Sequence, residues 1–478
     1  MNTAQRIAKN TAVLLIAQIV SLTFGFFYTM YSARYLGAEG FGTLSFALAF
    51  TSILGLFSDL GFSSLTVREV ARNKALANKY IGNISVIKVG LSIFAYILIV
   101  LVSNQMSYPE QTLKVIQLIA LAVICNGFAS MFYTIFQASE KLEYVSFGRI
   151  LNATLMLVFT IIAINQGLNV VGFAFIYFGV SAFCLFISLL IYILNLGIIK
   201  PEFDWPFLKP TINAALPFFL SAIVDTIAFR IDVVMLSMMK GDIIVGWYSA
   251  SYRLLEALMF IPAILGGSIY PAFSRFHISS QESLKIAYRK SFEYLTILSL
   301  PIAVGTTILA EKIIVLIYGN NYEPSIIALR VLIWTIPVIF LSYLMGTTLA
   351  SINRQSLAVK ITFTGMLLNI LMNLILIPKY SFVGASVATV VTSMSSLAIG
   401  FYFISRFVCS FPIYRFLLKL LAANTIMGLF LINIINNNII LLIAVSIILY
   451  TVLLLILRVF SREDLILVKR ILPAFMKG

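Results

Sequence analysis

The chain has 478 residues, of which 61% are hydrophobic and only 11% are charged, and its formal net charge is +15. Such a composition excludes an ordinary soluble domain and is typical of a protein with many membrane spans. The positive charge does not indicate nucleic-acid binding, because the basic residues lie mostly in alternate loops, as the orientation of a membrane protein requires.

Apolar runs follow one another along the whole chain, and each is about 20 residues long, enough to cross the hydrocarbon core as a helix. We therefore predict an all-α polytopic membrane protein with about 14 transmembrane helices. The first run extends through Tyr31 with no small-residue cleavage site after it, so we expect a retained helix and not a signal peptide. In chain order the predicted spans are centred near Val20, Phe50, Ile93, Val123, Val158, Phe178, Thr226, Phe260, Pro301, Pro337, Leu368, Val391, Met427 and Val445.

Lysine and arginine are unevenly distributed between the loops. The loop from Arg68 to Lys79 holds four of them, whereas the loops NQMSYPEQ and IYGNNYEPS, on the opposite side, have none. By the positive-inside rule, the basic loops and both termini face the cytoplasm, and the turn at Gly241 to Gly246 faces outside.

An internal repeat organises the chain. The segment Gly37-AEGF-Gly42-TL-Ser45 has the same spacing as Gly241-DIIV-Gly246-WY-Ser249, and NVVGFAF around Gly172 is echoed by SFVGASV around Gly384. Spans one to six are thus repeated by spans seven to twelve. A repeat of an even number of spans keeps its orientation, so the halves are expected to be related by an axis along the membrane normal.

This repeat predicts four regions. We expect an N-terminal six-helix lobe over residues 1–199 and a C-terminal six-helix lobe over 200–408, which enclose a central cavity and rock against each other in alternating access. Two additional transmembrane helices over 409–458 fall outside the repeat. The tail over 459–478 is predicted to be an amphipathic segment on the anionic cytoplasmic surface.

Ionisable residues are densest between Leu216 and Glu256. Charged groups in hydrocarbon cost a few kcal/mol each, so they normally face a watery cavity or a partner. Asp225 and Asp232 share one face of their helix, and Arg253 and Glu256 share one face of the next. Two readings stay open: these groups neutralise one another as structural ion pairs, or some of them line a polar cavity for an anionic or sugar-bearing substrate.

Metal and cofactor chemistry has little support in the sequence. The three cysteines form no CxxC pair, and the single histidine, His277, lies in a polar loop. We therefore expect no metal site and no cofactor, and since every outer loop is too short to carry a catalytic centre, we expect no enzyme.

Four segments of the chain carry a family resemblance: RYLGAEGFGTLSFALAFTSILGLFSDLGFSSLTVRE, LPFFLSAIVDTIAFRIDVVML, YSASYRLLEALMFIPAILGGSIYPAFSR and NILMNLILIPKYSFVGASVAT. They resemble the polysaccharide and O-antigen unit flippases of the multidrug/oligosaccharidyl-lipid/polysaccharide exporter superfamily. The resemblance implies a protein of the inner (cytoplasmic) membrane that flips polyprenyl-(pyro)phosphate-linked oligosaccharide units to the outer leaflet for surface glycan assembly. Glycan polymerases or glycosyltransferases are plausible partners, and a monomer is expected because the cavity would be internal to one chain.

The pyrophosphate of such a carrier needs cationic partners, and the planar guanidinium of arginine suits phosphate. Arg230 and Arg253 are the first candidates, followed by Arg330 and Arg34. Three amides, Gln18, Asn369 and Asn373, are candidates to contact the sugar or to form interhelical hydrogen bonds. The carboxylates of Asp225, Asp232 and Glu256 are candidates to bind a coupling proton or sodium ion, or to form ion pairs with the arginines. Asp59, in the motif DLGF, is expected beside Arg68 and Arg72 as an inner gate or loop clamp.

Two other transport functions remain possible from the sequence. An ion-coupled multidrug or cation exporter of the same superfamily would have twelve spans and a cavity dominated by carboxylates and aromatic residues. A flippase for the peptidoglycan precursor would share the lipid-carrier chemistry.

Overall fold

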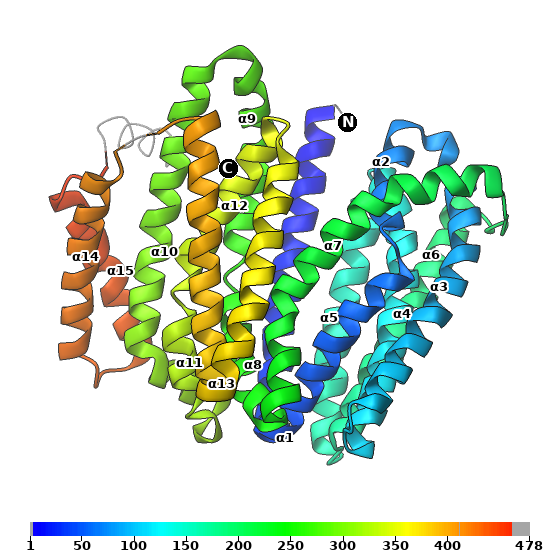
Figure 1. Cartoon of the computed structure of the whole chain (residues 1–478), viewed down its shortest axis with the longest axis horizontal. Coiled ribbons are helices and arrows are strands. Elements are labelled where there is room, and N and C mark those ends of the chain that lie inside the picture. The colour runs from blue at the N-terminus through cyan, green and yellow to red at the C-terminus, as the bar shows by residue number, and fades with distance from the viewer. Residues whose placement is uncertain (1–2, 411, 461–478) are drawn as a thin grey trace. The chain divides into compact units, whose positions relative to one another are not determined.

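The structure is a computed structural model of the chain, and it describes residues 3–410 and 412–460 (Figure 1). All regular elements in this part of the chain are helices, which confirms the predicted all-α fold. Each predicted span centre lies in a helix. All but the first two residues of the predicted tail over 459–478 lie outside the described residues.

Fifteen α-helices are described, with short 3-10 turns between some of them. The first seven are α1 (Thr3–Gly55), α2 (Phe62–Arg72), α3 (Ala77–Gln105), α4 (Glu110–Ala138), α5 (Leu142–Asn165), α6 (Val170–Leu196) and α7 (Trp205–Lys240). The others are α8 (Asp242–Glu256), α9 (Phe260–Ser279), α10 (Gln281–Tyr318), α11 (Ser325–Leu332), α12 (Thr335–Ser351), α13 (Gln355–Phe407), α14 (Tyr414–Asn433) and α15 (Ile439–Ile456).

Eleven helical segments of the described chain are long and apolar enough to cross a membrane. Two of the helices involved, α1 and α13, have 53 residues each, far more than the roughly 20 that one crossing needs. Each contains one residue with non-helical backbone, Gly37 in α1 and Ser381 in α13, which divides it into two helices. The protein therefore has many spans, and the number of about 14 stays a prediction.

The segment that follows the first pair of predicted spans is a helix and not the predicted loop. Helix α2 covers 11 residues, too few to cross a bilayer. It forms because its apolar residues recur at helical spacing, so that Leu65 and Val70 are buried while Arg68 and Arg72 point outward.

The chain divides into two compact units. Unit 1 comprises the residues up to Ala250 together with Met366–Ala385, and unit 2 comprises Ser251–Gly365 and the residues from Ser386 on. In unit 1, α1 packs on α5 and α7, and α4 packs on α6. In unit 2, α12 packs on α9 and α10, and α14 and α15 pack on α10. The division into an N-terminal lobe over 1–199 and a C-terminal lobe over 200–408 stays a prediction.

Candidate functional site

Asp232 of α7 is the centre of a buried polar cluster in unit 1. Its side chain is only 3% exposed, and it accepts hydrogen bonds from two helices: Tyr248 Oη of α8 donates to Oδ2 at 2.9 Å, and Asn373 Nδ2 of α13 donates to Oδ1 at 2.5 Å. Asn373 Nδ2 also lies 3.0 Å from Oδ1 of Asn369, one turn earlier on the same helix face. The structure thus brings together three of the predicted site residues.

The cluster leaves one acceptor without a donor. Oδ1 of Asn373 is buried and has no hydrogen-bond partner among the described residues. Buried polar atoms are almost always hydrogen-bonded, so such an atom calls for an explanation. A carboxylate and amide oxygens in one dry place are the ligand types that hard cations prefer.

Asp225 has different surroundings from Asp232. Asp225 lies two turns earlier on α7, on the same helix face as Asp232, as the sequence predicts. Unlike Asp232, it is exposed. The structure therefore separates the two carboxylates into one buried group and one accessible group.

Arg253 and Glu256 form an ion pair on α8, with Nη1 and Oε2 at 2.7 Å, and their side chains are 30% and 22% exposed. They lie in the last turn of α8, just before a short turn with i→i−3 hydrogen bonds that separates α8 from α9, which begins at Phe260. The pairing is the one that their spacing predicts.

A second span, which lies in unit 2, is built in the same way. Arg330 is exposed in the last turn of α11, and a short turn with i→i−3 hydrogen bonds separates α11 from α12, which begins at Thr335. Ser251 Oγ donates to the carbonyl oxygen of Ser325 at 2.7 Å, which joins α8 to the start of α11. Two interrupted helices, each with an arginine in the last turn of its first half, are therefore neighbours.

Three other candidates lie in unit 1, two of them on α1 and one, Arg230, on α7 with Asp232. Gln18 of α1 accepts a hydrogen bond of 3.4 Å from Nη1 of Arg149 on α5. Arg34 is exposed near the end of the first half of α1, and Arg230 is half-buried on α7.

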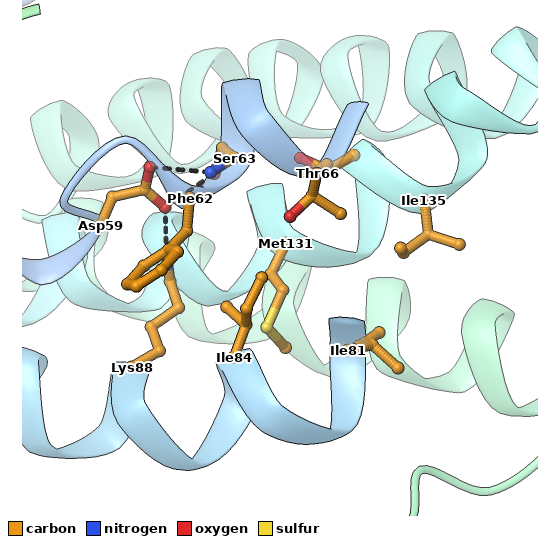
Figure 2. Close-up of a pocket in the computed structure, with 10 residues that line it drawn as sticks. Asp59, Phe62, Ser63, Thr66, Ile81, Ile84, Lys88, Met131 and Ile135 are labelled. Atoms are coloured by element: carbon orange, nitrogen blue, oxygen red, sulfur yellow. Dashed lines mark hydrogen bonds and ion pairs between the residues drawn. The ribbon is translucent and has the colours of Figure 1, made fainter. Parts of the chain in front are cut away.

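Asp59 follows α1 and pairs with Lys88 of α3, as Figure 2 shows. Lys88 Nζ lies 2.5 Å from Oδ1, and the lysine side chain is 1% exposed. Ser63 of α2 adds hydrogen bonds from its backbone N at 3.1 Å and from its Oγ at 2.7 Å. Burial raises the pKa of Asp59, but Lys88 and Ser63 outweigh that effect, and the pKa lies below its ordinary value.

The partner of Asp59 is thus Lys88 and not Arg68, which instead pairs with Glu69 at 2.7 Å and lies over the ring of Phe218. The role of Asp59 and Arg68 as an inner gate or loop clamp stays a prediction. The sequence does carry a signal for Lys88, since it is the one charged residue in the apolar run ISVIKVGLSIF.

The two turns of the predicted repeat face each other in unit 1. Gly37 and Gly241 have the same left-handed, extended backbone, with φ of 69° and 85° and ψ near 180°, which favours glycine. Thr43 Oγ1 donates to Oδ2 of Asp242 at 2.7 Å, and Ser237 Oγ donates to Oδ1 at 3.0 Å.

Tyr108, in the loop between α3 and α4, extends this network. Its hydroxyl lies 2.8 Å from Oγ of Ser237, and because the serine proton points to Asp242, Tyr108 is the donor. Burial raises the pKa of Tyr108 to about 12, so the hydroxyl keeps its proton at physiological pH. Four segments of unit 1 are joined at this end of the helices.

Comparisons with known proteins agree with this architecture. Residues 7–277 match the family described as "Polysaccharide biosynthesis protein", and residues 217–375 match the MatE family. The capsular polysaccharide biosynthesis protein CapF of Staphylococcus aureus is 22% identical over 410 residues, covering 83% of this chain and 99% of that protein. The probable low-salt glycan biosynthesis flippase Agl15 of Haloferax volcanii is 20% identical over 404 residues, covering 84% of each chain.

Among solved structures, the lipid II flippase MurJ in an inward closed conformation has the same fold, with a TM-score of 0.78 and 16% identity over 94% of this chain and 99% of that one. The first family match spans more than half of the sequence. The chain therefore belongs to the polysaccharide biosynthesis protein family.

Proposed function

We propose that the protein flips oligosaccharide units linked to a polyprenyl phosphate or pyrophosphate from the cytoplasmic to the outer leaflet, for assembly of a surface glycan. The family membership supports this function, as do relatives named for capsular polysaccharide biosynthesis and for glycan flipping. The observation that carries the proposal is the pair of interrupted helices in unit 2, which place Arg253 and Arg330 at helix breaks.

Interrupted helices within membrane spans suit a binding site. At both interruptions the hydrogen bonds tighten to an i→i−3 pattern next to a proline, an adjustment that membrane helices tolerate, and transporters place binding sites at discontinuous helices. Arginine at such a break offers a bidentate fork to a phosphate. Glu256 balances Arg253 in the absence of substrate, and we propose that the carrier phosphate replaces this partner. Arg230 and Arg34 are secondary cationic candidates, and Gln18 is a candidate for the sugar.

We further propose that the Asp232 cluster binds a monovalent cation that couples to transport. Its single carboxylate suits one positive charge, and the buried Oδ1 of Asn373 would gain a partner when the cation binds. Asn369 and Asn373 are both buried, so we assign them to this ion and not to the sugar. Asp225, which is exposed, is the candidate for a proton.

We also propose an orientation of the protein in the membrane. The basic loops and both termini face the cytoplasm, in the inner membrane of the cell, since lysine and arginine are concentrated there. We propose a monomer as the working unit, supplied by glycosyltransferases and followed by a glycan polymerase.

The match of residues 217–375 to the MatE family favours one second candidate, an ion-coupled exporter of cationic compounds. A proteoliposome assay separates these functions. Purified protein is tested for movement of a fluorescent polyprenyl-pyrophosphate oligosaccharide between leaflets, with a peptidoglycan-precursor lipid and a cationic dye as parallel substrates. We expect movement of the oligosaccharide lipid. Movement of the dye alone would favour the exporter, and movement of the peptidoglycan precursor alone would favour that lipid as the substrate.

A further inference from the structure

Helix α10 contains a proline in its interior, Pro301, four residues after Ile297. Proline has no N–H, so the Ile297 carbonyl loses the hydrogen bond that a continuous helix would give it. In the structure this carbonyl accepts a hydrogen bond of 2.9 Å from the hydroxyl of Tyr450, on α15. Tyr450 is 6% exposed, so the bond is shielded from solvent and lipid.

Two other prolines of unit 2 are handled differently. Four residues before Pro262, the carbonyl oxygen of Leu258 accepts a hydrogen bond of 3.2 Å from the backbone N of Ile261. Four residues before Pro337, the carbonyl oxygen of Ile333 accepts one of 3.0 Å from the backbone N of Ile336. In both cases the chain tightens locally and satisfies its own carbonyl, and the helix is interrupted. At Pro301 the helix continues, and the missing bond comes from another helix.

The hairpin formed by α14 and α15 is held against α10 at further points (Figure 1). Lys312 Nζ of α10 donates to the carbonyl oxygen of Asn437, in the turn of the hairpin, at 2.9 Å. Gly428 of α14 packs so closely that a Cβ there would lie 3.3 Å from side-chain atoms of Val304 and Ile308. These contacts flank Pro301 on its C-terminal side.

We propose that the α14–α15 hairpin is a brace for the proline-containing helix α10, and that Tyr450 is the positioning residue that satisfies the carbonyl released by Pro301. An unpaired carbonyl within the hydrocarbon is unfavourable, and transmembrane helices keep interior prolines where neighbouring groups supply the bond. The two helices outside the repeat therefore act on unit 2 through α10.

A double-mutant cycle tests this assignment. Tyr450→Phe removes only the hydroxyl, and Pro301→Ala gives position 301 an N–H that can bond to Ile297 within α10. We expect Tyr450→Phe to lower the unfolding temperature of the purified protein by about 1–2 °C when residue 301 is proline. We expect a smaller loss from Tyr450→Phe when residue 301 is alanine, because the hydroxyl then gives up only its contact with Asn424. An equal loss in both backgrounds would mean that the hydroxyl does not serve the proline, and would overturn the proposal.

Thr451→Val is the matched control. Its hydroxyl donates to the Ile447 carbonyl of its own helix at 2.7 Å and contacts no other element in that bond. We expect this variant to unfold at the same temperature as the unaltered protein in both backgrounds. If Tyr450→Phe does not accumulate alone, the comparison of Pro301→Ala with Pro301→Ala/Tyr450→Phe remains, and an unfolding temperature of the double variant that is lower by about the full 1–2 °C would contradict the brace.

The consequence for transport rests on the proposed function and is measured separately, as the rate of oligosaccharide-lipid movement in proteoliposomes. We expect Tyr450→Phe to slow transport severalfold when residue 301 is proline and to have no effect on the rate in the Pro301→Ala background. Equal rates of Tyr450→Phe and the unaltered protein would overturn the positioning role. If the unaltered protein moves no substrate, the proposed function fails, and the thermal cycle still decides whether the brace exists.

Discussion

Gly42 of α1 lies directly against the carbonyl oxygen of Asp242, so closely that a Cβ on Gly42 would come within 1.8 Å of that atom. The relationship is reciprocal, because a Cβ on Gly246 would come within 1.9 Å of the carbonyl oxygen of Ala38. Each glycine contacts the residue that follows the turn glycine of the other repeat. Both contacts lie in unit 1 and support the repeat that the spacing of these glycines predicts.

This contact predicts that a methyl group at position 42 is harmful. We expect Gly42→Ala to destabilise the protein by about 1–3 kcal/mol, because the backbone of one turn must move to accept the new atom. The measurement is thermal unfolding in detergent. Gly25→Ala, in the part of α1 before Gly37, is the control, since a Cβ there would meet only Tyr28 at an ordinary 3.8 Å. Equal unfolding temperatures for the two variants would contradict the close packing.

The proposed phosphate contact predicts a transport defect without a folding defect. We expect Arg253→Ala to reduce oligosaccharide-lipid movement at least about tenfold, since a hydrogen bond to a charged group contributes about 1.5–3 kcal/mol. Arg289→Ala is the control, because Arg289 pairs with Glu293 at 2.9 Å in an intact part of α10. If Arg253 only balances Glu256, the double variant Arg253→Ala/Glu256→Ala regains transport, and the phosphate contact is then excluded.

The Asp232 cluster predicts stabilisation by a cation that binds the folded protein. We expect sodium chloride to raise the unfolding temperature more than choline chloride at the same ionic strength, and Asp232→Asn to abolish this difference. Asp225→Asn, which changes an exposed carboxylate on the same helix, is expected to retain it. A sodium effect that survives in Asp232→Asn would place the ion elsewhere.

The Asp59–Lys88 pair predicts a dependence on pH. Because the pKa of Asp59 is lowered in the folded protein, the pair contributes fully above the ordinary value of 3.8 and is lost as the pH falls through the lower folded-state pKa. We expect the unaltered protein to lose more stability below about pH 4 than the variant Asp59→Asn/Lys88→Met does.

The single variants give a second test of the same pair. Removing one partner of a buried ion pair costs about 3–5 kcal/mol, whereas replacing both by uncharged residues is often neutral. We therefore expect Asp59→Asn alone to unfold at a lower temperature than the double variant, at neutral pH. A double variant no more stable than the single one would mean that Lys88 does not depend on Asp59.

Composition and periodicity predicted the helices well, because a membrane span needs a long apolar run that the sequence displays directly. The partners of the charged residues were harder to predict from the sequence. The pairing of Arg253 with Glu256 is local and follows from helical spacing, whereas the pairing of Asp59 with Lys88 depends on how α3 packs on the end of α1. Periodicity placed Asp225 and Asp232 on one face, but it does not say which neighbouring helix covers each turn.

The same limit applies to the interrupted helices and to the brace. A proline in an apolar run indicates that one carbonyl loses its usual hydrogen bond. The sequence does not say whether the chain tightens locally to supply a donor, as at Pro262 and Pro337, or another helix supplies it, as Tyr450 does at Pro301. Those outcomes depend on tertiary packing.

The contact between the two glycine turns has one more property. It is isologous, since each turn presents the same glycine and the same carbonyl to the other. Two copies of the same turn can therefore bind each other, and no different partner surface is needed. A six-span chain that already paired with itself through this turn would therefore need no new interface when its gene was duplicated and fused.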